Sequence, residues 1–190
     1  MDTVLHFVYS KEDEIRTFKA FQRLQEGDEA VELYEFYHAS YGYGSAVTTF
    51  QRRNRATSVF EPAGEIAWQG NTTATVHFGV HEACKIAHLL GILVTTAGTC
   101  ADLPEGPEKN EKVDQPVKQS RRFKAGGVEY KWKIAEGDDL YCVEASSKKT
   151  VATWTDKETT LRVTASAEQV LDRMVVTCVL NLWVRHLGLW

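Results

Sequence analysis

Residues 174–184 read Met-Val-Val-Thr-Cys-Val-Leu-Asn-Leu-Trp-Val, a run that is apolar on almost every side of a helix. Charged pairs flank this run, Asp172-Arg173 before it and Arg185-His186 after it. Eleven residues rise only about 16 Å as an α-helix, roughly half the hydrocarbon thickness of a bilayer, so we expect no transmembrane span. This helix has no polar face, and the rest of the chain is rich in strand patterns. We therefore predict that the helix lies inside a closed sheet.

The start of this helix carries a capping pattern. Ser166-Ala-Glu-Gln169 places a hydroxyl three residues before an amide, the spacing at which the two side chains and backbone amides satisfy one another. We therefore predict a helix from Ser166 to His186.

Short strands fill most of the remaining chain. β-branched and aromatic residues recur between turn residues, and Val128, Tyr130, Trp132 and Ile134 alternate with three charged residues, which is typical of a half-buried strand. The stretch 14–24 is ambiguous, because Ile15, Phe18, Phe21 and Leu24 have the spacing of one side of a short helix. Candidate strands in the first part are 4–9, 31–37, 47–50, 57–60, 65–68 and 75–78, and a four-stranded antiparallel meander follows at 128–134, 140–143, 151–154 and 161–163.

Two segments interrupt the strands. Apolar residues from Val80 to Val94 fall at helical spacing and predict one additional helix near 80–94. Residues 101–119 carry three of the four prolines and many charges, which favours a mobile surface loop. We expect a single domain over residues 1–190 with this loop inside it.

Composition limits the classes of function. The chain has 190 residues, 22 Lys and Arg against 26 Asp and Glu, and a net charge of −4, which argues against general nucleic-acid binding. The N-terminus lacks a basic leader followed by an apolar run, and the four cysteines form no Cys-x-x-Cys pair. These features predict an intracellular, cytoplasmic protein with reduced thiols.

Several segments, in this order along the chain, carry a resemblance to a known family. They are Ala63-Gly-Glu-Ile-Ala-Trp68, Arg122-Phe-Lys-Ala-Gly-Gly-Val-Glu-Tyr-Lys-Trp-Lys133, Val151-Ala-Thr-Trp154 and Leu171-Asp-Arg-Met-Val-Val-Thr177. With them the chain resembles a fungal family of tubby-like proteins that has no assigned activity. Gly126-Gly127 stands where that family has an Asp-Gly turn, a change that a hairpin tolerates.

The resemblance implies a fold and, by analogy, a ligand. The implied fold is mainly β: a tubby-like closed antiparallel barrel or sandwich around the buried C-terminal helix. Relatives at the superfamily level bind phosphoinositides or lie at membranes, which implies an anionic lipid as partner and a peripheral position at a membrane.

Two basic clusters are the candidate ligand-binding residues. The first is Arg52, Arg53 and Arg55, between two predicted strands, and the second is Arg121, Arg122 and Lys124. If the clusters meet on one surface, their arginines can bind a phosphorylated headgroup through paired hydrogen bonds. The alternative interpretation is an ordinary solvated strand face whose cations are offset by nearby acids.

A second cluster of residues suggests metal binding or nucleophilic catalysis. His81, Cys84 and His88 stand at i, i+3 and i+7 of the predicted helix and would form one stripe of zinc-type ligands, or a thiol nucleophile beside a base. Three ligands on one helix converge poorly, and no nucleotide-binding or hydrolase motif accompanies them, so we assign no metal and no cofactor.

These observations favour a non-catalytic intracellular module that binds an anionic or amphipathic ligand such as a phospholipid headgroup, at a membrane surface. One alternative is a small-molecule enzyme whose pocket uses His81, Cys84 and His88. Another is a scaffold or oligomerising protein. The sequence leaves the ligand and the oligomeric state open.

Overall fold

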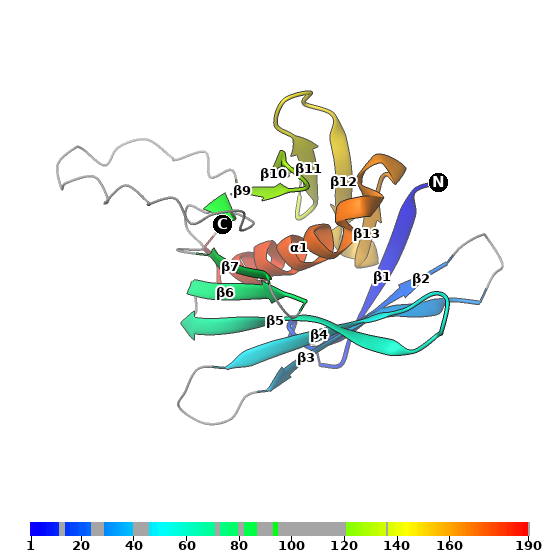
Figure 1. Cartoon of the computed structure of the whole chain (residues 1–190). Coiled ribbons are helices and arrows are strands. Elements are labelled where there is room, and N and C mark those ends of the chain that lie inside the picture. The colour runs from blue at the N-terminus through cyan, green and yellow to red at the C-terminus, as the bar shows by residue number, and fades with distance from the viewer. Residues whose placement is uncertain are drawn as a thin grey trace.

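The computed structural model describes residues 1–11, 14–23, 29–39, 46–70, 73–79, 121–135 and 137–189, and the backbone of 82–86 and 93–94. Thirteen strands and one long helix make up the described part (Figure 1). The strands are β1 (Thr3–Tyr9), β2 (Phe18–Gln22), β3 (Val31–Ala39), β4 (Val47–Arg53), β5 (Phe60–Gly70), β6 (Thr73–Phe78), β7 (Glu82–Ile86), β8 (Leu93–Val94), β9 (Arg121–Ala125), β10 (Val128–Ile134), β11 (Leu140–Glu144), β12 (Thr150–Thr155) and β13 (Thr160–Val163). The helices are η1 (Asp156–Glu158), η2 (Ala165–Val170) and α1 (Leu171–His186).

The strands form one sheet whose order is β7-β6-β5-β4-β3-β2-β1-β13-β12-β11-β10-β9-β8. Neighbouring strands are antiparallel, except that β8 pairs with β9 in parallel. Two meanders therefore meet where β1 pairs with β13, and α1 runs between the two halves of the curved sheet (Figure 1).

The apolar helix is enclosed, as its sequence predicts. Met174, Val175, Cys178 and Val184 of α1 have no exposed surface, and the large fully buried side chains of the sheet, such as Trp132, belong to the same core cluster. The strands supply alternate side chains to this core, because successive strand residues point to opposite faces. The helix of the described residues is too short to be a membrane span.

The expected strand pattern is confirmed along most of the chain, including the meander after residue 128. The β9–β10 hairpin turns at Gly126 and Gly127, which have φ of 57° and 78°. Positive φ at both turn positions suits a two-residue hairpin turn and is accessible to glycine without strain. The stretch 14–24 contributes β2, and β5 begins only at Phe60, so residues 57–59 lie outside any strand.

Three expectations need correction. The additional helix near 80–94 is wrong for the described residues, because β7 and β8 lie in this range. A short apolar run fits either period, and here the edge of β6 pairs with the segment, with Val76 opposite Cys84. The sheet is also open, not a closed barrel: β7 and β8 are its two ends, and no pairing joins them in the described residues.

The helix start is the third correction. Residues Ala165–Val170 form the 3₁₀ helix η2, and α1 begins only at Leu171, with no side-chain cap at either start. The Ser166 hydroxyl instead lies 3.0 Å from the hydroxyl of Thr164. The tighter 3₁₀ turn replaces the capping box. The loop expected at 101–119 lies outside the described residues.

Candidate anion-binding groove

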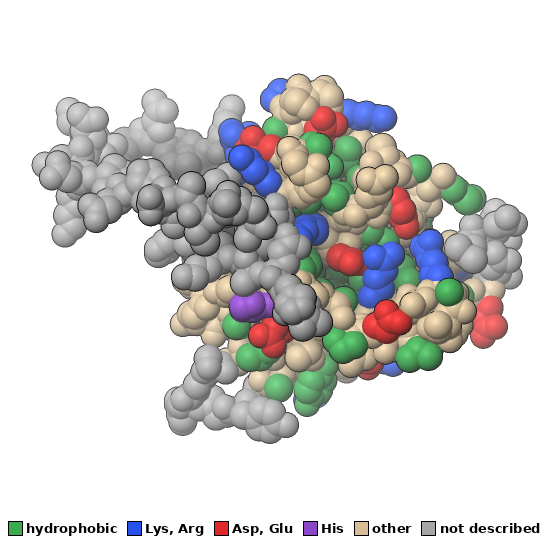
Figure 2. All heavy atoms as spheres, viewed as in Figure 1, with side chains coloured by type: hydrophobic (Ala, Val, Ile, Leu, Met, Phe, Trp, Pro, Cys, Tyr) green, Lys and Arg blue, Asp and Glu red, His purple; other side chains and the backbone are tan. Residues whose placement is uncertain are grey.

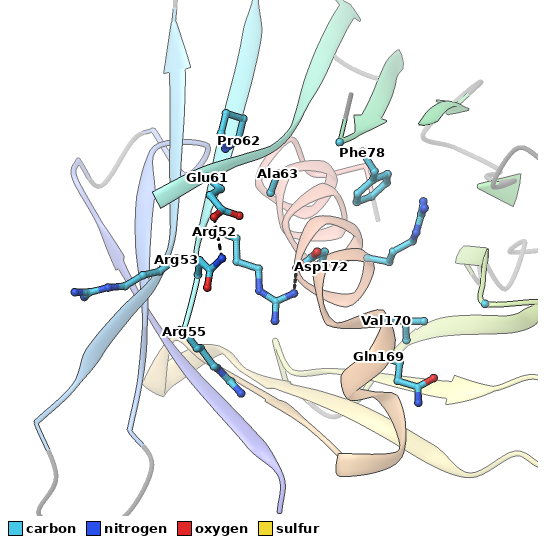
Figure 3. Close-up of a pocket in the computed structure, with 14 residues that line it drawn as sticks. Arg52, Arg53, Arg55, Glu61, Pro62, Ala63, Phe78, Gln169, Val170 and Asp172 are labelled. Atoms are coloured by element: carbon cyan, nitrogen blue, oxygen red, sulfur yellow. Dashed lines mark hydrogen bonds and ion pairs between the residues drawn. The ribbon is translucent and has the colours of Figure 1, made fainter. Parts of the chain in front are cut away.

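A groove of about 890 Å³ opens beside the start of α1. Four parts of the chain form it: the β4–β5 hairpin, the end of β6, the β9–β10 turn, and the junction of η2 with α1 (Figure 3). We call it groove 1. Its lining residues are Arg52, Arg53, Asn54, Arg55, Glu61, Pro62, Ala63, Phe78, Gly79, Gly126, Gln169, Val170, Asp172 and Arg173.

Arg52 is fixed in groove 1 by a short network. Its Nη1 donates to Oδ1 of Asp172 at 2.8 Å, and the hydroxyl of Tyr34 donates to the same oxygen. The guanidinium also lies 5.6 Å from the centre of the Tyr34 ring. Burial and the nearby charge of Asp172 raise the pKa of Tyr34 well above its usual value, so this phenol stays protonated and donates. Asp172 thus ties β3, β4 and α1 together.

Arg55 is held more loosely. Its Nη2 donates to the side-chain oxygen of Gln22 at 2.8 Å and lies 3.5 Å from Oε1 of Glu168. Half of its side chain, 53%, is exposed, so the pair with Glu168 is weakly stabilising and readily exchanged for another anion. Figure 3 shows the Arg55 side chain extending toward the open side of the groove.

The other two arginines differ in direction. The guanidinium of Arg53 points away from the groove, where its Nε donates to the carbonyl of Ser58 at 3.1 Å (Figure 3). Arg173 comes from α1, and its guanidinium lies 4.0 Å from the centre of the Phe78 ring, a cation–π contact. Arginines therefore approach the groove from both the sheet and the helix.

The charge of the groove is positive although the chain is acidic. Of the four arginines that line groove 1, Arg53 points its guanidinium away, which leaves three arginines against the carboxylates of Glu61 and Asp172. Oε1 of Glu61 accepts from the side-chain amide of Asn54 at 2.8 Å, and Asp172 is occupied by Arg52. Acidic and basic side chains alternate on the face where the two halves of the sheet approach each other (Figure 2). The apolar part of the wall is Pro62, Ala63, Phe78 and Val170.

The second predicted cluster does not join the first. Arg121 points inward and is 5% exposed, beside a small cavity lined by Trp132 and Asn181, and burial lowers its pKa to about 10. Arg122 and Lys124 are exposed on the opposite face, because strand residues alternate.

Arg122 lines a separate groove of about 440 Å³, which we call groove 2. The turn between the two grooves contributes Gly126 to groove 1 and Gly127 to groove 2. Of the second cluster only Arg122 lines groove 2, so the two clusters do not share a groove.

The residues of the metal or nucleophile alternative fall largely outside the described part of the chain. His81 and His88 lie outside the described residues, as does the side chain of Cys84. The backbone of Cys84 is in strand β7, so the helical spacing that aligned it with the two histidines does not apply to it. Among the described residues, no group of His, Cys, Asp and Glu side chains is arranged to hold a metal ion.

The sequence analysis assigned no role at a binding site to Glu168 and Asp172, which contact Arg55 and Arg52. Tyr34 and Asp172 are 138 positions apart, and no local pattern relates them. The sequence feature that could have indicated Asp172 is the charged pair Asp172-Arg173 at the N-terminal end of an apolar helix, since charged side chains there need solvent or partners.

Comparison with known proteins gives one match. The family model described as "Family of unknown function (DUF6593)" matches residues 21–186. No curated protein and no solved structure matches the chain. The chain belongs to this family of unknown function.

Proposed function

We propose that the protein is a non-catalytic module that binds an anionic or amphipathic ligand, such as a phospholipid headgroup, in groove 1. The observation that carries the proposal is that Arg55 from the β4–β5 hairpin and Arg173 from α1 line the same groove. Arginine offers paired, charge-assisted hydrogen bonds to phosphate oxygens. The expected relation to tubby-like proteins, proposed from the sequence, supports the same class of ligand.

The apolar wall of groove 1 supports the amphipathic part of the proposal. Pro62, Ala63 and Phe78 form a wall beside the arginines, against which the glycerol or upper acyl part of a lipid can pack. We propose an intracellular protein that binds peripherally at a membrane through this groove.

The test compares vesicles of phosphatidylcholine with vesicles that also contain phosphoinositides, in a sedimentation assay. The variant is Arg55→Gln with Arg173→Gln, because Arg52 also holds Tyr34 and Asp172 and its loss would disturb the fold. We expect the double variant to bind at least about tenfold more weakly, since hydrogen bonds to charged groups contribute about 1.5–3 kcal/mol each.

Arg53→Gln is the control. It removes one positive charge from the same hairpin, but its guanidinium points away from groove 1. We expect it to bind within about twofold of the parent, as a rim charge does. A soluble inositol phosphate, added as competitor, separates headgroup recognition from attraction to the vesicle surface. Equal recovery of parent and double variant on phosphoinositide vesicles would reject the proposal.

A further inference from the structure

Groove 2 lies on the face of the sheet turned away from α1. It is formed by β9, β10, the end of β11 and the turn that follows β11. In Figure 2, Lys and Arg side chains are visible at the end of the molecule where β11 and β12 meet. The residues that line groove 2 are Arg122, Gly127, Val128, Glu129, Lys131, Glu144, Ala145, Ser146 and Lys148.

Three cations share groove 2, and their placement is costly for the fold alone. Arg122 and Lys131 are directly opposite each other in the β9–β10 register. Like charges at such a cross-strand pair destabilise a sheet. The pKa of Lys131 is lowered by burial and by the charges of Arg122, Lys133 and Lys148. The third cation of the groove, Lys148, stands at a left-handed position, φ 61°, which glycine or asparagine adopts more readily.

The carboxylates of groove 2 form an ion pair with only one of these three cations, Arg122. Glu129 accepts from Arg122 at 3.1 Å, and Oε1 of Glu144 accepts from the hydroxyl of Ser146 at 2.6 Å. Lys148 donates to the carbonyl of Ala145, also at 2.6 Å. Neither Lys131 nor Lys148 has an ion pair with a carboxylate from the part of the chain that the structure describes.

We propose that groove 2 is a second binding site, for a phosphate or sulfate group, independent of groove 1. Arg122 supplies a planar pair of donors, and Lys131 and Lys148 supply point charges from the other strand and the turn. A bound dianion offsets the repulsion between Arg122 and Lys131, so the like-charge pair is stabilised when the site is occupied. The site does not require the proposed function of groove 1, because no lining residue is shared.

The experiment is a titration of ¹⁵N-labelled protein with inorganic phosphate and with a soluble inositol trisphosphate, followed by amide resonances. Gly127 and Ser146 report on groove 2, and Asn54 and Gln169 report on groove 1. We expect saturable shifts at Gly127 and Ser146. Vesicles of phosphatidylcholine with and without phosphatidylserine then distinguish a lipid-borne phosphate from a free one.

The variant is Lys131→Gln with Lys148→Gln, and the control is Lys133→Gln. Lys133 is on the same strand but lies over the Tyr141 ring, 5.4 Å from its centre, and does not line groove 2. We expect at least about tenfold weaker binding at groove 2 in the double variant and less than about twofold change in the control.

Two outcomes overturn the proposal: no saturable shift at Gly127 and Ser146 with either probe, or a double variant that binds as tightly as the control. Shifts at these two amides with none at Asn54 and Gln169 would support groove 2 while rejecting groove 1. The two proposals therefore fail separately.

Discussion

Replacing Asp172 with asparagine should tighten anion binding in groove 1 while slightly weakening the fold. The carboxylate of Asp172 lies 2.8 Å from Nη1 of Arg52 and competes with any external anion for that guanidinium. Asparagine keeps a side-chain oxygen that accepts from Tyr34, but it has no charge. The released Arg52 would add a third arginine to Arg55 and Arg173 in the groove.

The size of both effects follows from the geometry. An anion on Arg52 would sit about 6 Å from the Asp172 carboxylate, and at an effective dielectric of about 20–40 their repulsion is about 1.5–3 kcal/mol. Salt screening reduces this to about 1–2 kcal/mol, which is a gain of about five- to thirtyfold in affinity. Both side chains of the pair are about a third exposed, 34% and 35%, so its loss should cost under about 1 kcal/mol of stability.

Calorimetric titration with a soluble inositol phosphate measures the affinity, and urea unfolding measures the stability. Asp138→Asn is the control, because it makes the same change of net charge at the other end of α1, where Asp138 pairs with Arg185 at 2.6 Å. If Asp172→Asn binds no more tightly than Asp138→Asn while its circular dichroism is unchanged, the reasoning that Asp172 competes with an external anion for Arg52 is wrong.

Three further predictions concern stability. Gly64→Ala should prevent folding or cost more than about 3 kcal/mol, because a Cβ there overlaps the backbone carbonyl of His77; low soluble yield and early unfolding in urea would show this, and near-parental stability would contradict it. The pKa of His38 is lowered from 6.5 by burial and by Arg16, so the unfolded chain takes up the proton first and stability should fall as the pH drops below about 6.5. A His38→Gln variant should lack this part of the pH dependence in denaturant titrations, and an unchanged slope would refute it. Met174→Ala should cost about 2–5 kcal/mol by opening a cavity in a fully enclosed site, and a loss below about 1 kcal/mol in urea unfolding would argue against tight packing around α1.

Strong local periodicity made part of the fold predictable from the sequence. The alternation from Val128 to Ile134 predicts which side chains face the core, and Tyr130 and Trp132 are buried as expected, whereas Ile134 at the end of the strand is 43% exposed. The apolar run 174–184 requires enclosure on all sides, and its burial is confirmed. The prediction of a helix at residues 80–94 was wrong because their apolar spacing fits a helix as well as a strand. Pairing with β6 selects the strand, and that pairing is seen only in the folded structure. The open edge of the sheet has the same origin, since closure depends on pairing between distant strands.

The candidate site was predictable only where its residues are neighbours in sequence. Arg52, Arg53 and Arg55 are adjacent, and the hairpin places them together at one rim. Direction was harder to predict: Arg53 turns away within the first cluster, and Arg121 and Arg122 face opposite sides of β9. Contacts such as Tyr34 with Asp172 join segments that only the curved sheet brings close.

The two ends of α1 explain why groove 1 is where it is. A helix with no polar face reaches solvent only at its ends, so charged residues are placed there. At the C-terminal end, Arg16 lies 4.0 Å from the centre of the Trp183 ring and is held by Glu14 through two hydrogen bonds of 2.8 Å, which covers that end. At the N-terminal end, the residues around Asp172 leave a groove instead. The C-terminal end of α1 is therefore covered by Arg16, whereas the N-terminal end opens into groove 1, which is lined by arginines. We expect the ligand at this open N-terminal end.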